Sequence, residues 1–179
     1  EVPVGETGEI IASMNALDAF SGYWKRPDAD EKSIRDGWYF TGDLGRFDED
    51  GEIYVLGRVD DMIISGGENV SSIEVEDCLF SHPAVAEVAV IGVPDEKWGE
   101  TIKALVVLAD VGDSDDPGNQ GADLPGEQDL IDHCRDSLAH FKCPTSVEFR
   151  DELARTATGK LQKFKLRAPY WEGMAKQVN

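Results

Sequence analysis

The sequence predicts an α+β fold in which helices pack on a sheet, and three observations carry this prediction. A Ser-x-x-Glu capping box at residues 71–74 precedes an apolar run, which is typical of a helix N-terminus. Two runs rich in β-branched residues, at 85–93 and 101–108, indicate strands. Apolar residues then recur with helical spacing over 130–138. From residue 60 onward the expected order is β, α, β, β, α, β, the pattern of a small α+β domain.

The first expected elements are two short strands within residues 42–58. A turn over Asp48-Glu49-Asp50-Gly51 joins them, with glycine supplying the permissive backbone position. Met62-Ile63-Ile64 is then expected to form a short apolar strand that runs into Gly66-Gly67.

The capping box predicts a helix over about 72–81, with Ser71 as its N-cap. The strands expected at Val85–Val93 and Thr101–Leu108 flank a turn-rich loop at 94–100. These elements form the centre of the predicted domain.

Residues 109–126 hold five Asp, four Gly, two Pro and no Lys or Arg, a composition that predicts an exposed loop. A helix over about 127–140 should follow, because four apolar residues fall on one of its faces: Leu130, Ile131, Cys134 and Leu138. Val147 and Phe149 indicate a last strand, and residues 161–168 a basic helix or turn.

The charge excludes two classes of partner. The 179 residues include 36 acidic and 17 basic ones, which gives a formal charge of −19. Nucleic acids and anionic lipids are polyanions, so a protein this acidic is not expected to bind their phosphates. The longest apolar stretch, Val85 to Val93, contains Glu87 and is far shorter than the roughly 20 residues that cross a bilayer. No membrane-spanning helix is expected.

Several local features indicate a cytoplasmic piece of a longer chain. The N-terminus has neither an initiator Met nor the basic and apolar regions of a signal peptide.

Trp98 is expected to be a packing anchor. The cysteines are odd in number and form no Cys-x-x-Cys, so small buried or half-buried thiols are expected at Cys78, Cys134 and Cys143. The histidines lack metal-ligand spacing, and no metal site is expected at His82, His133 or His140.

The make-up of the acidity is unusual, with 20 Asp and 16 Glu against only 9 Lys. Carboxylates spread along a Lys-poor chain are typical of surfaces adapted to molar salt, where screening removes the self-repulsion. In this respect the sequence resembles haloarchaeal proteins, and its stability should fall in dilute buffer. The alternative is an acidic protein from a mesophile.

Three motifs could carry chemistry. The first, Gly37-Trp-Tyr-Phe-Thr-Gly-Asp-Leu44, ends in Asp43 beside a glycine at a strand. A rigid carboxylate in that position can accept two hydrogen bonds from a vicinal diol such as a ribose. By itself, Asp43 could equally be a capping residue in a turn.

The second motif, Gly57-Arg-Val-Asp-Asp-Met-Ile-Ile-Ser-Gly-Gly-Glu-Asn-Val70, places a cation, an acid pair and paired glycines within fourteen residues. Paired glycines let a ligand approach the backbone closely, and a charged residue between two modules can act as a pivot. An ordinary β-turn with a surface salt bridge would give the same pattern.

The third motif, Arg155-Thr-Ala-Thr-Gly-Lys-Leu-Gln-Lys163, places Lys160 after a small, flexible loop. Such a lysine can reach into a site and neutralise charge on a phosphoryl or carboxylate oxygen. The motif is not a P-loop, because Ala154 and Leu161 occupy the positions that require Gly and Ser or Thr. Alone it could be a surface turn.

Taken together and in this order, the three motifs resemble the C-terminal third of the acyl-adenylate-forming superfamily, which includes acyl-CoA synthetases and the adenylation domains of peptide synthetases. The resemblance covers nearly the whole chain. It rests on Tyr39–Asp43, on Gly57–Gly67 with Glu74-Val-Glu76, on His82-Pro-Ala-Val85 with Val93-Pro-Asp95, and on Arg155–Lys160.

The resemblance implies a ligase that forms an acyl-AMP from a carboxylate and ATP and then a thioester with CoA. In the family, the residue matching Asp43 binds the ribose and that matching Arg58 helps to hold the nucleotide. The residue matching Asp60 is the hinge of the small domain. The lysine matching Lys160 is the catalytic cation of adenylation, and the loop matching Gly66-Gly67-Glu68 lines the pantetheine channel of the thioester step.

The sequence departs from the family in three ways. Ala154 stands where the family usually has proline, and Ile64 where lysine is common. The phosphate loop, adenine pocket and acyl pocket of the family's large domain are absent. Residues 1–58 are therefore expected to be the last strands of that large domain and residues 59–179 the complete small domain, with the ATP, CoA and Mg²⁺ sites incomplete in this segment and the fragment alone inactive.

The acceptor and the acyl group are less well defined by the sequence. The segment Glu68–Ser72 looks more like short- and medium-chain acyl-CoA synthetases than like peptide-synthetase domains. The alternatives are an adenylation domain that loads a carrier protein and a non-enzymatic interaction module that lost the large domain.

Overall fold

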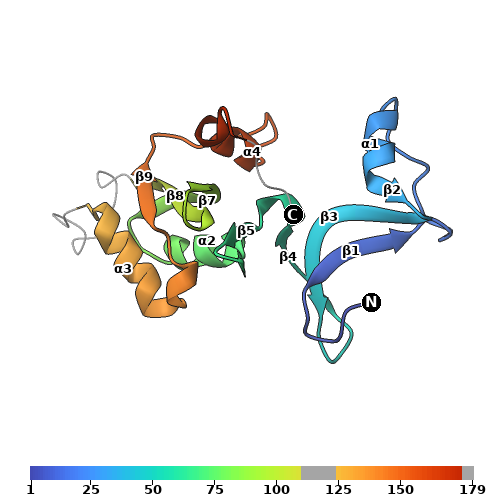
Figure 1. The fold of residues 1–179 in the computed structure, drawn as a ribbon, viewed down its shortest axis with the longest axis horizontal. Coiled ribbons are helices and arrows are strands. Elements are labelled where there is room, and N and C mark those ends of the chain that lie inside the picture. The colour runs from blue at the N-terminus through green and yellow to red at the C-terminus, as the bar shows by residue number, and fades with distance from the viewer. Residues whose placement is uncertain (110–123, 175–179) are drawn as a thin grey trace, which may run out of the picture. The chain divides into compact units, whose positions relative to one another are not determined.

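The structure is a computed structural model of the chain and describes residues 1–109 and 124–174. The chain divides into two compact units, Glu1–Asp60 and Asp61–Asn179, each with its own sheet. Figure 1 shows the helices and strands of both units.

The first unit is an antiparallel sheet centred on its longest strand. That strand, β3, pairs with each of the other three. The elements are β1 (Gly8–Ser13), α1 (Pro27–Ser33), β2 (Ile34–Arg35), β3 (Trp38–Phe47) and β4 (Ile53–Arg58). β3 and β4 confirm the expected pair of strands. β1 also agrees with the strands expected in residues 1–58, whereas the helix α1 was not expected there.

The β3–β4 turn forms where it was expected, and the Asp48 carboxylate holds it. Its Oδ1 atom accepts hydrogen bonds from the backbone N–H groups of Asp50 (3.0 Å) and Glu52 (2.8 Å). Such Asx interactions are the reason aspartate is favoured in turns. The turn pairs Phe47 with Ile53, and a shift of register between Leu44 and Gly45 then brings Arg58 opposite Asp43.

The second unit has a five-stranded sheet with the order β6-β5-β8-β7, and β9 pairs with β8 in parallel. All other pairs are antiparallel. The strands are β5 (Ile63–Ser65), β6 (Glu68–Val70), β7 (Val85–Asp95), β8 (Gly99–Leu108) and β9 (Ser146–Phe149). The helices are α2 (Ser72–Phe80), α3 (Glu127–Ser137) and α4 (Lys163–Arg167), with short 3-10 turns η1 (Val59–Asp61), η2 (His140–Lys142) and η3 (Ala168–Trp171).

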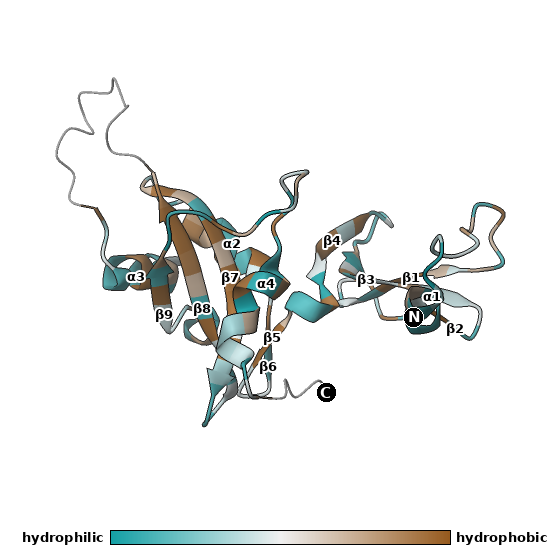
Figure 2. Cartoon of the chain, turned by 90° about the horizontal axis from the view of Figure 1, so that it is seen from above, coloured by the Kyte–Doolittle hydropathy of each residue, from teal (hydrophilic) through white to brown (hydrophobic). Residues whose placement is uncertain are grey.

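The long strands β7 and β8 are buried on both faces, which explains their nearly continuous apolar sequences. One face packs on α2 and α3 in a core that includes Leu79, Ile102 and Leu130. The other face forms a second cluster with Leu161 and Leu166. Figure 2 shows the hydrophobic residues concentrated along β7 and β8.

Two details of the predicted helices were wrong. Ser71 is the N-cap of α2, but its side chain makes no capping hydrogen bond. The Glu74 carboxylate binds the Lys142 ammonium at 2.6 and 2.8 Å. Helix α3 ends at Ser137, before the expected residue 140, because Leu138 is extended.

The remaining expectations concern the cysteines, membrane-spanning helices and the acidic loop. Cys134 and Cys143 are buried free thiols and Cys78 is half-buried, as expected. Among residues 1–109 and 124–174, no helix is long and apolar enough to cross a membrane. Most of the loop expected at 109–126 lies outside the described residues.

Candidate functional site

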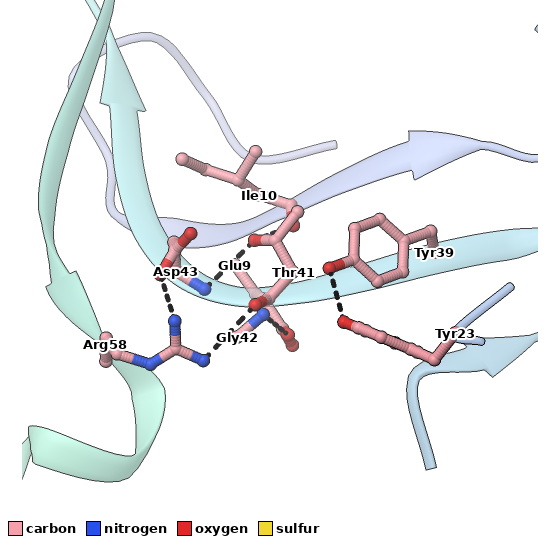
Figure 3. A network of polar contacts seen from close by, with 8 residues as sticks. All are labelled: Glu9, Ile10, Tyr23, Tyr39, Thr41, Gly42, Asp43 and Arg58. Atoms are coloured by element: carbon pink, nitrogen blue, oxygen red, sulfur yellow. Dashed lines mark hydrogen bonds and ion pairs between the residues drawn. The ribbon is translucent and has the colours of Figure 1, made fainter. Parts of the chain in front are cut away.

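An ion pair joins the first two site residues predicted from the sequence. Arg58 Nη1 lies 2.8 Å from Asp43 Oδ1, and Arg58 Nη2 donates a longer bond of 3.4 Å to the Thr41 carbonyl (Figure 3). The Asp43 and Arg58 side chains are 39% and 45% exposed. The carboxylate is thus held in place by a cation and is still accessible to a ligand hydroxyl.

The backbone around Asp43 is held from the neighbouring strand β1. Thr41 Oγ1 accepts the Asp43 N–H at 3.0 Å and donates to the Ile10 carbonyl at 2.8 Å. The Gly42 N–H donates to Glu9 Oε1 at 3.0 Å. Sequence analysis missed Glu9, because nothing in the local pattern shows that β1 will pair with β3.

Gly42 is required by the position of Arg58. Its φ of +74° is a conformation that favours glycine, and a Cβ on it would lie 2.7 Å from Arg58 Nη2. A side chain at residue 42 would therefore displace the guanidinium that positions Asp43.

A group of aromatic side chains surrounds Tyr39, which lies on the same strand as Asp43. The hydroxyls of Tyr23 and Tyr39 are 2.9 Å apart, and the Phe20 ring meets Tyr39 edge-on with centroids 4.6 Å apart. The hydrogen bond to Tyr23 raises the pKa of Tyr39, so the phenol stays protonated. Figure 3 shows Tyr39 on the same strand as Thr41 and Asp43.

Asp60, the expected hinge residue, lies in the 3-10 turn Val59–Asp61 and is exposed. It is the last residue of the first compact unit.

The paired glycines form the two-residue turn of the β5–β6 hairpin. Ser65 pairs with Glu68, and both intervening glycines have positive φ, +61° for Gly66 and +87° for Gly67. A type I′ hairpin turn requires this geometry. Strand β6 was not predicted, although the Gly-Gly pair was a signal that could have revealed it.

Trp98 braces this turn. Its carbonyl accepts the Gly66 N–H at 2.9 Å, and its ring lies where a Gly66 side chain would be, since a Cβ there would be 2.6 Å from the ring. The residue is 48% exposed, so it is a packing anchor at the surface rather than in the core. A hollow of about 590 Å³ adjoins the turn, lined among others by Ile64, Trp98 and Trp171.

Lys160 lies at the end of a tight loop whose two sides are tied together. An isolated bridge joins Arg155 to Leu161, and Thr156 and Lys160 exchange hydrogen bonds of 2.8 and 3.0 Å. Arg155 also donates to the Gly159 carbonyl at 2.8 Å. The Lys160 ammonium is exposed, and in the described part of the chain it makes no hydrogen bond or ion pair.

The structure thus brings together only part of the predicted site. Asp43 and Arg58 are partners, whereas Lys160 and the Gly66-Gly67-Glu68 turn belong to the other unit and lie on separate elements of it. Within residues 1–109 and 124–174, no cluster of three or more His, Cys, Asp or Glu side chains could hold a metal ion.

Comparison with known proteins gives consistent results. Residues 74–160 match the family described as AMP-binding enzyme C-terminal domain. A feruloyl-CoA synthase of an Amycolatopsis species is 45% identical over 166 residues, which is 93% of this chain and 31% of the relative. A fatty acid–[acyl-carrier-protein] ligase, ScoC of Streptomyces coeruleorubidus, is 40% identical over 100% of this chain and 32% of its own.

Solved structures show the same fold. ATP-bound MatB from Rhodopseudomonas palustris is similar with a TM-score of 0.77 and 38% identity, covering 94% of this chain and 31% of that one. The chain spans about a third of the length of these relatives. Its mixed sheet and helices have the fold of the C-terminal domain of adenylate-forming enzymes. The matches to this domain and to acyl-CoA ligases support the assignment of the chain to the adenylate-forming superfamily.

Proposed function

We propose that this chain is the C-terminal part of an ATP-dependent acyl-CoA synthetase. The observation that carries this proposal is the braced loop that presents the bare Lys160 ammonium to solvent, in a chain whose relatives include CoA ligases. In the first half-reaction a carboxylate oxygen would attack the α-phosphorus of ATP and pyrophosphate would leave. In the second, the sulfur of CoA would attack the acyl carbon, AMP would leave and the thiol proton would pass to solvent.

Asp43 and Arg58 would hold the nucleotide. The Asp43 carboxylate can accept hydrogen bonds from both hydroxyls of a ribose, and charged acceptors make the stronger bonds. Its pairing with Arg58 at 2.8 Å fixes its position. Arg58 retains guanidinium donors for the nucleotide, because one nitrogen makes the ion pair and another makes only the long bond to Thr41.

Lys160 would act as a cation in the adenylation step. Attack of a carboxylate on a triphosphate brings two anions together, and a positioned ammonium between them lowers the barrier. Its exposure and lack of an internal partner suit a side chain that binds a ligand outside its own unit. We assign it no role as a base.

The Gly66-Gly67-Glu68 turn would replace Lys160 at the site in the thioester step. Two glycines without side chains allow the pantetheine arm of CoA to pass close to the backbone. Rotation about Asp60 would exchange the two loops, so that one unit serves two half-reactions in turn.

The proposal has further parts that concern the protein as a whole. Residues 1–58 would belong to the large nucleotide-binding domain and residues 59–179 to the mobile domain. The acyl group would be short to medium in length, and the segment by itself would be inactive. Mg²⁺ would accompany ATP, with its ligands outside this segment. We further propose a cytoplasmic protein adapted to high salt, in keeping with its net charge of −19.

A carrier-protein-loading enzyme is the second candidate. The match to an acyl-carrier-protein ligase over the whole chain favours it. Both candidates share the adenylation chemistry and differ in the thiol that accepts the acyl group.

The test uses the intact enzyme that contains this chain, in high salt, with carboxylates of increasing length. Lys160→Ala should lower acyl-AMP formation by about 10²- to 10³-fold, the usual effect of removing one electrostatic contact to a transition state. It should still convert supplied acyl-AMP to acyl-CoA. Lys165→Ala, which removes an exposed cation of the same segment, is the matched control and should leave both half-reactions intact.

Two results would count against the proposal. If Lys160→Ala forms acyl-AMP as fast as Lys165→Ala, the role of Lys160 is wrong. If the wild-type enzyme forms acyl-AMP but transfers it to a carrier protein and never to CoA, the second candidate replaces the first.

A further inference from the structure

The loop that carries Lys160 is held by one ion pair on each side, the first to strand β7 and the second to helix α2. Before the loop, Arg155 Nη2 lies 2.6 Å from Glu87 Oε2. After it, Lys163 Nζ lies 2.7 Å from Glu76 Oε1. Lys163 is the first residue of α4 and lies only three residues after Lys160.

The Lys163–Glu76 pair is the more buried of the two and has additional partners. Its side chains are 12% and 16% exposed, less than those of any other ion pair in the described part of the chain. Lys163 Nζ also donates to Ser72 Oγ at 2.8 Å, and Glu76 Oε1 accepts the Val90 N–H at 2.6 Å. The pair therefore joins α4, α2 and β7 at one point.

This point lies at the edge of the sheet. β7 is an edge strand, so the Val90 N–H has no neighbouring strand to bond and takes the Glu76 carboxylate instead. Helix α2 packs on one face of the sheet, whereas Leu161 and Leu166 pack on the other. Lys163 reaches the carboxylate from the segment on that second face.

The ion pair is poorly explained as a source of folding stability. Burial raises the pKa of Glu76 despite the opposing attraction of Lys163, so the ionised carboxylate is disfavoured in the folded chain. Buried ion pairs often contribute less than an apolar pair of the same shape. Such a pair does fix the orientation of the segment that carries it, whereas the apolar contacts of Leu161 and Leu166 alone do not.

Helix α4 needs such an anchor because it has only five residues. A helix this short is not stable by itself. Of its residues, Phe164 and Lys165 are exposed, whereas Leu166 packs against the second apolar cluster. The polar contacts of Lys163 are therefore a side-chain restraint on the C-terminal side of the Lys160 loop, in addition to the backbone hydrogen bond from the Gln162 N–H to the Ala154 carbonyl at 2.8 Å.

We propose that Lys163 is a positioning residue for Lys160, and that its ion pair with Glu76 fixes where the Lys160 ammonium is presented during adenylation. The inference rests on the proposed function. Lys163 itself would not contact the substrate. Loss of its contact with α2 would slow adenylation and leave thioester formation unchanged.

The chain offers a matched control on the same helix. Glu74, two residues before Glu76, binds Lys142 at 2.6 Å, with side chains 41% and 26% exposed. This pair joins α2 to η2 and does not involve the Lys160 loop. Lys163→Met and Lys142→Met each remove one ammonium from a carboxylate of α2, and they differ in which segment is released.

The experiment measures both half-reactions in the intact enzyme. Lys163→Met should lower kcat for acyl-AMP formation by about 10- to 100-fold, since small misplacements of a catalytic group have effects of that size. The KM for ATP and the conversion of supplied acyl-AMP should stay within about twofold of wild type, and Lys163→Arg should recover most of the rate. Lys142→Met should leave acyl-AMP formation unchanged.

A second readout does not depend on activity. Hydrogen exchange of the Lys160 amide, which donates to Thr156 Oγ1, should become at least about 10-fold faster in Lys163→Met and stay unchanged in Lys142→Met. If Lys163→Met fails to fold, as judged by exchange in β8, Glu76→Gln takes its place because it keeps an acceptor for Val90.

The outcomes separate the two proposals. A wild-type enzyme that forms no acyl-AMP refutes the proposed function, and the exchange experiment still decides whether Lys163 holds the loop. Positioning by Lys163 is refuted if Lys163→Met and Lys142→Met behave alike, or if Lys163→Met slows both half-reactions equally.

Discussion

Replacing Gly66 by alanine should destabilise the second unit far more than the same change at its neighbour. Both glycines have positive φ, a conformation that costs an L-residue roughly 1–2 kcal/mol. Alanine also lowers the conformational entropy of the unfolded chain, which raises the free energy of unfolding by about 0.4–1 kcal/mol. Gly67→Ala, whose Cβ meets nothing within 4 Å, should therefore cost about 1 kcal/mol.

At Gly66 a steric clash adds to this cost. The new Cβ would lie 2.6 Å from the Trp98 ring, so the ring or the turn must move. Overpacking of this kind typically costs about 1–3 kcal/mol, which brings Gly66→Ala to about 2–4 kcal/mol in total. Removing the ring with Trp98→Ala should abolish the added cost, so the double variant should show a coupling energy of about 1–3 kcal/mol.

Native-state hydrogen exchange is the suitable assay, because the chain has two units and a single unfolding curve would mix them. Slowly exchanging amides of β8 report the free energy of unfolding of the second unit alone. Equal destabilisation by Gly66→Ala and Gly67→Ala, or strict additivity of Gly66→Ala with Trp98→Ala, would refute the contact between the ring and the turn.

Three further predictions concern the whole surface, the thiols and one histidine. With a charge of −19, the urea midpoint should rise as KCl increases from 0.1 to about 2 M, because salt screens the self-repulsion. Cys134 and Cys143 should resist iodoacetamide at pH 8 until urea is added, because both are buried and burial raises their pKa; mass spectrometry counts the adducts. Partial burial, and then the neighbouring His133, hold the pKa of His82 below its usual 6.5. Stability should therefore fall as the pH drops below 6.5, and His82→Gln should reduce that fall in urea titrations.

Each of these has a clear contrary result. A urea midpoint independent of salt would contradict adaptation of the surface to high salt. Rapid alkylation of Cys134 in the native chain would contradict its burial. His82→Gln with the same acid sensitivity as wild type would show that other groups, and not this imidazole, bind the protons that destabilise the fold.

The central fold was predictable because its signals are local. The apolar runs of β7 and β8 mark strands buried on both faces, and the spacing of Leu130, Ile131 and Cys134 marks one face of α3. The turn at Asp48 was predictable for the same reason, since its Asx hydrogen bonds span only a few residues.

The capping box shows where a local signal fails. Ser71 and Glu74 have the right types and spacing, and the helix does begin there, but the Ser71 side chain makes no capping hydrogen bond and Glu74 binds Lys142. A residue 68 positions away in the sequence cannot be foreseen from a four-residue motif. Strand β6 is a different case, because the Gly-Gly turn that pairs it with β5 is a local signal.

The residues of the candidate site come from motifs in the sequence, whereas the residues that support them do not. Asp43, Arg58 and Lys160 belong to motifs whose chemistry is visible in the sequence. Glu9 and Glu76 support them from other strands and helices, through pairings that only the folded chain defines.

Buried polar side chains in the second unit are placed under the two candidate loops. The described residues include two, Ser72 and Glu100, which are 4% and 6% exposed. Ser72 accepts a hydrogen bond from Lys163, beneath the Lys160 loop. Glu100 Oε2 accepts the Ile64 N–H at 3.4 Å, on the strand that leads into the Gly66-Gly67 turn.

Gly92 leaves the space that the Glu100 carboxylate needs. The Glu100 carboxylate occupies the space that a side chain at Gly92 would fill. Buried polar groups are expensive and an apolar pair of similar shape often stabilises a fold more, so stability gives little reason to keep them. Directional support of the loops does give one, because hydrogen bonds fix orientation where apolar packing does not. The interior of this unit is therefore polar where the two proposed half-reactions need loops of defined geometry, and apolar where only cohesion is required.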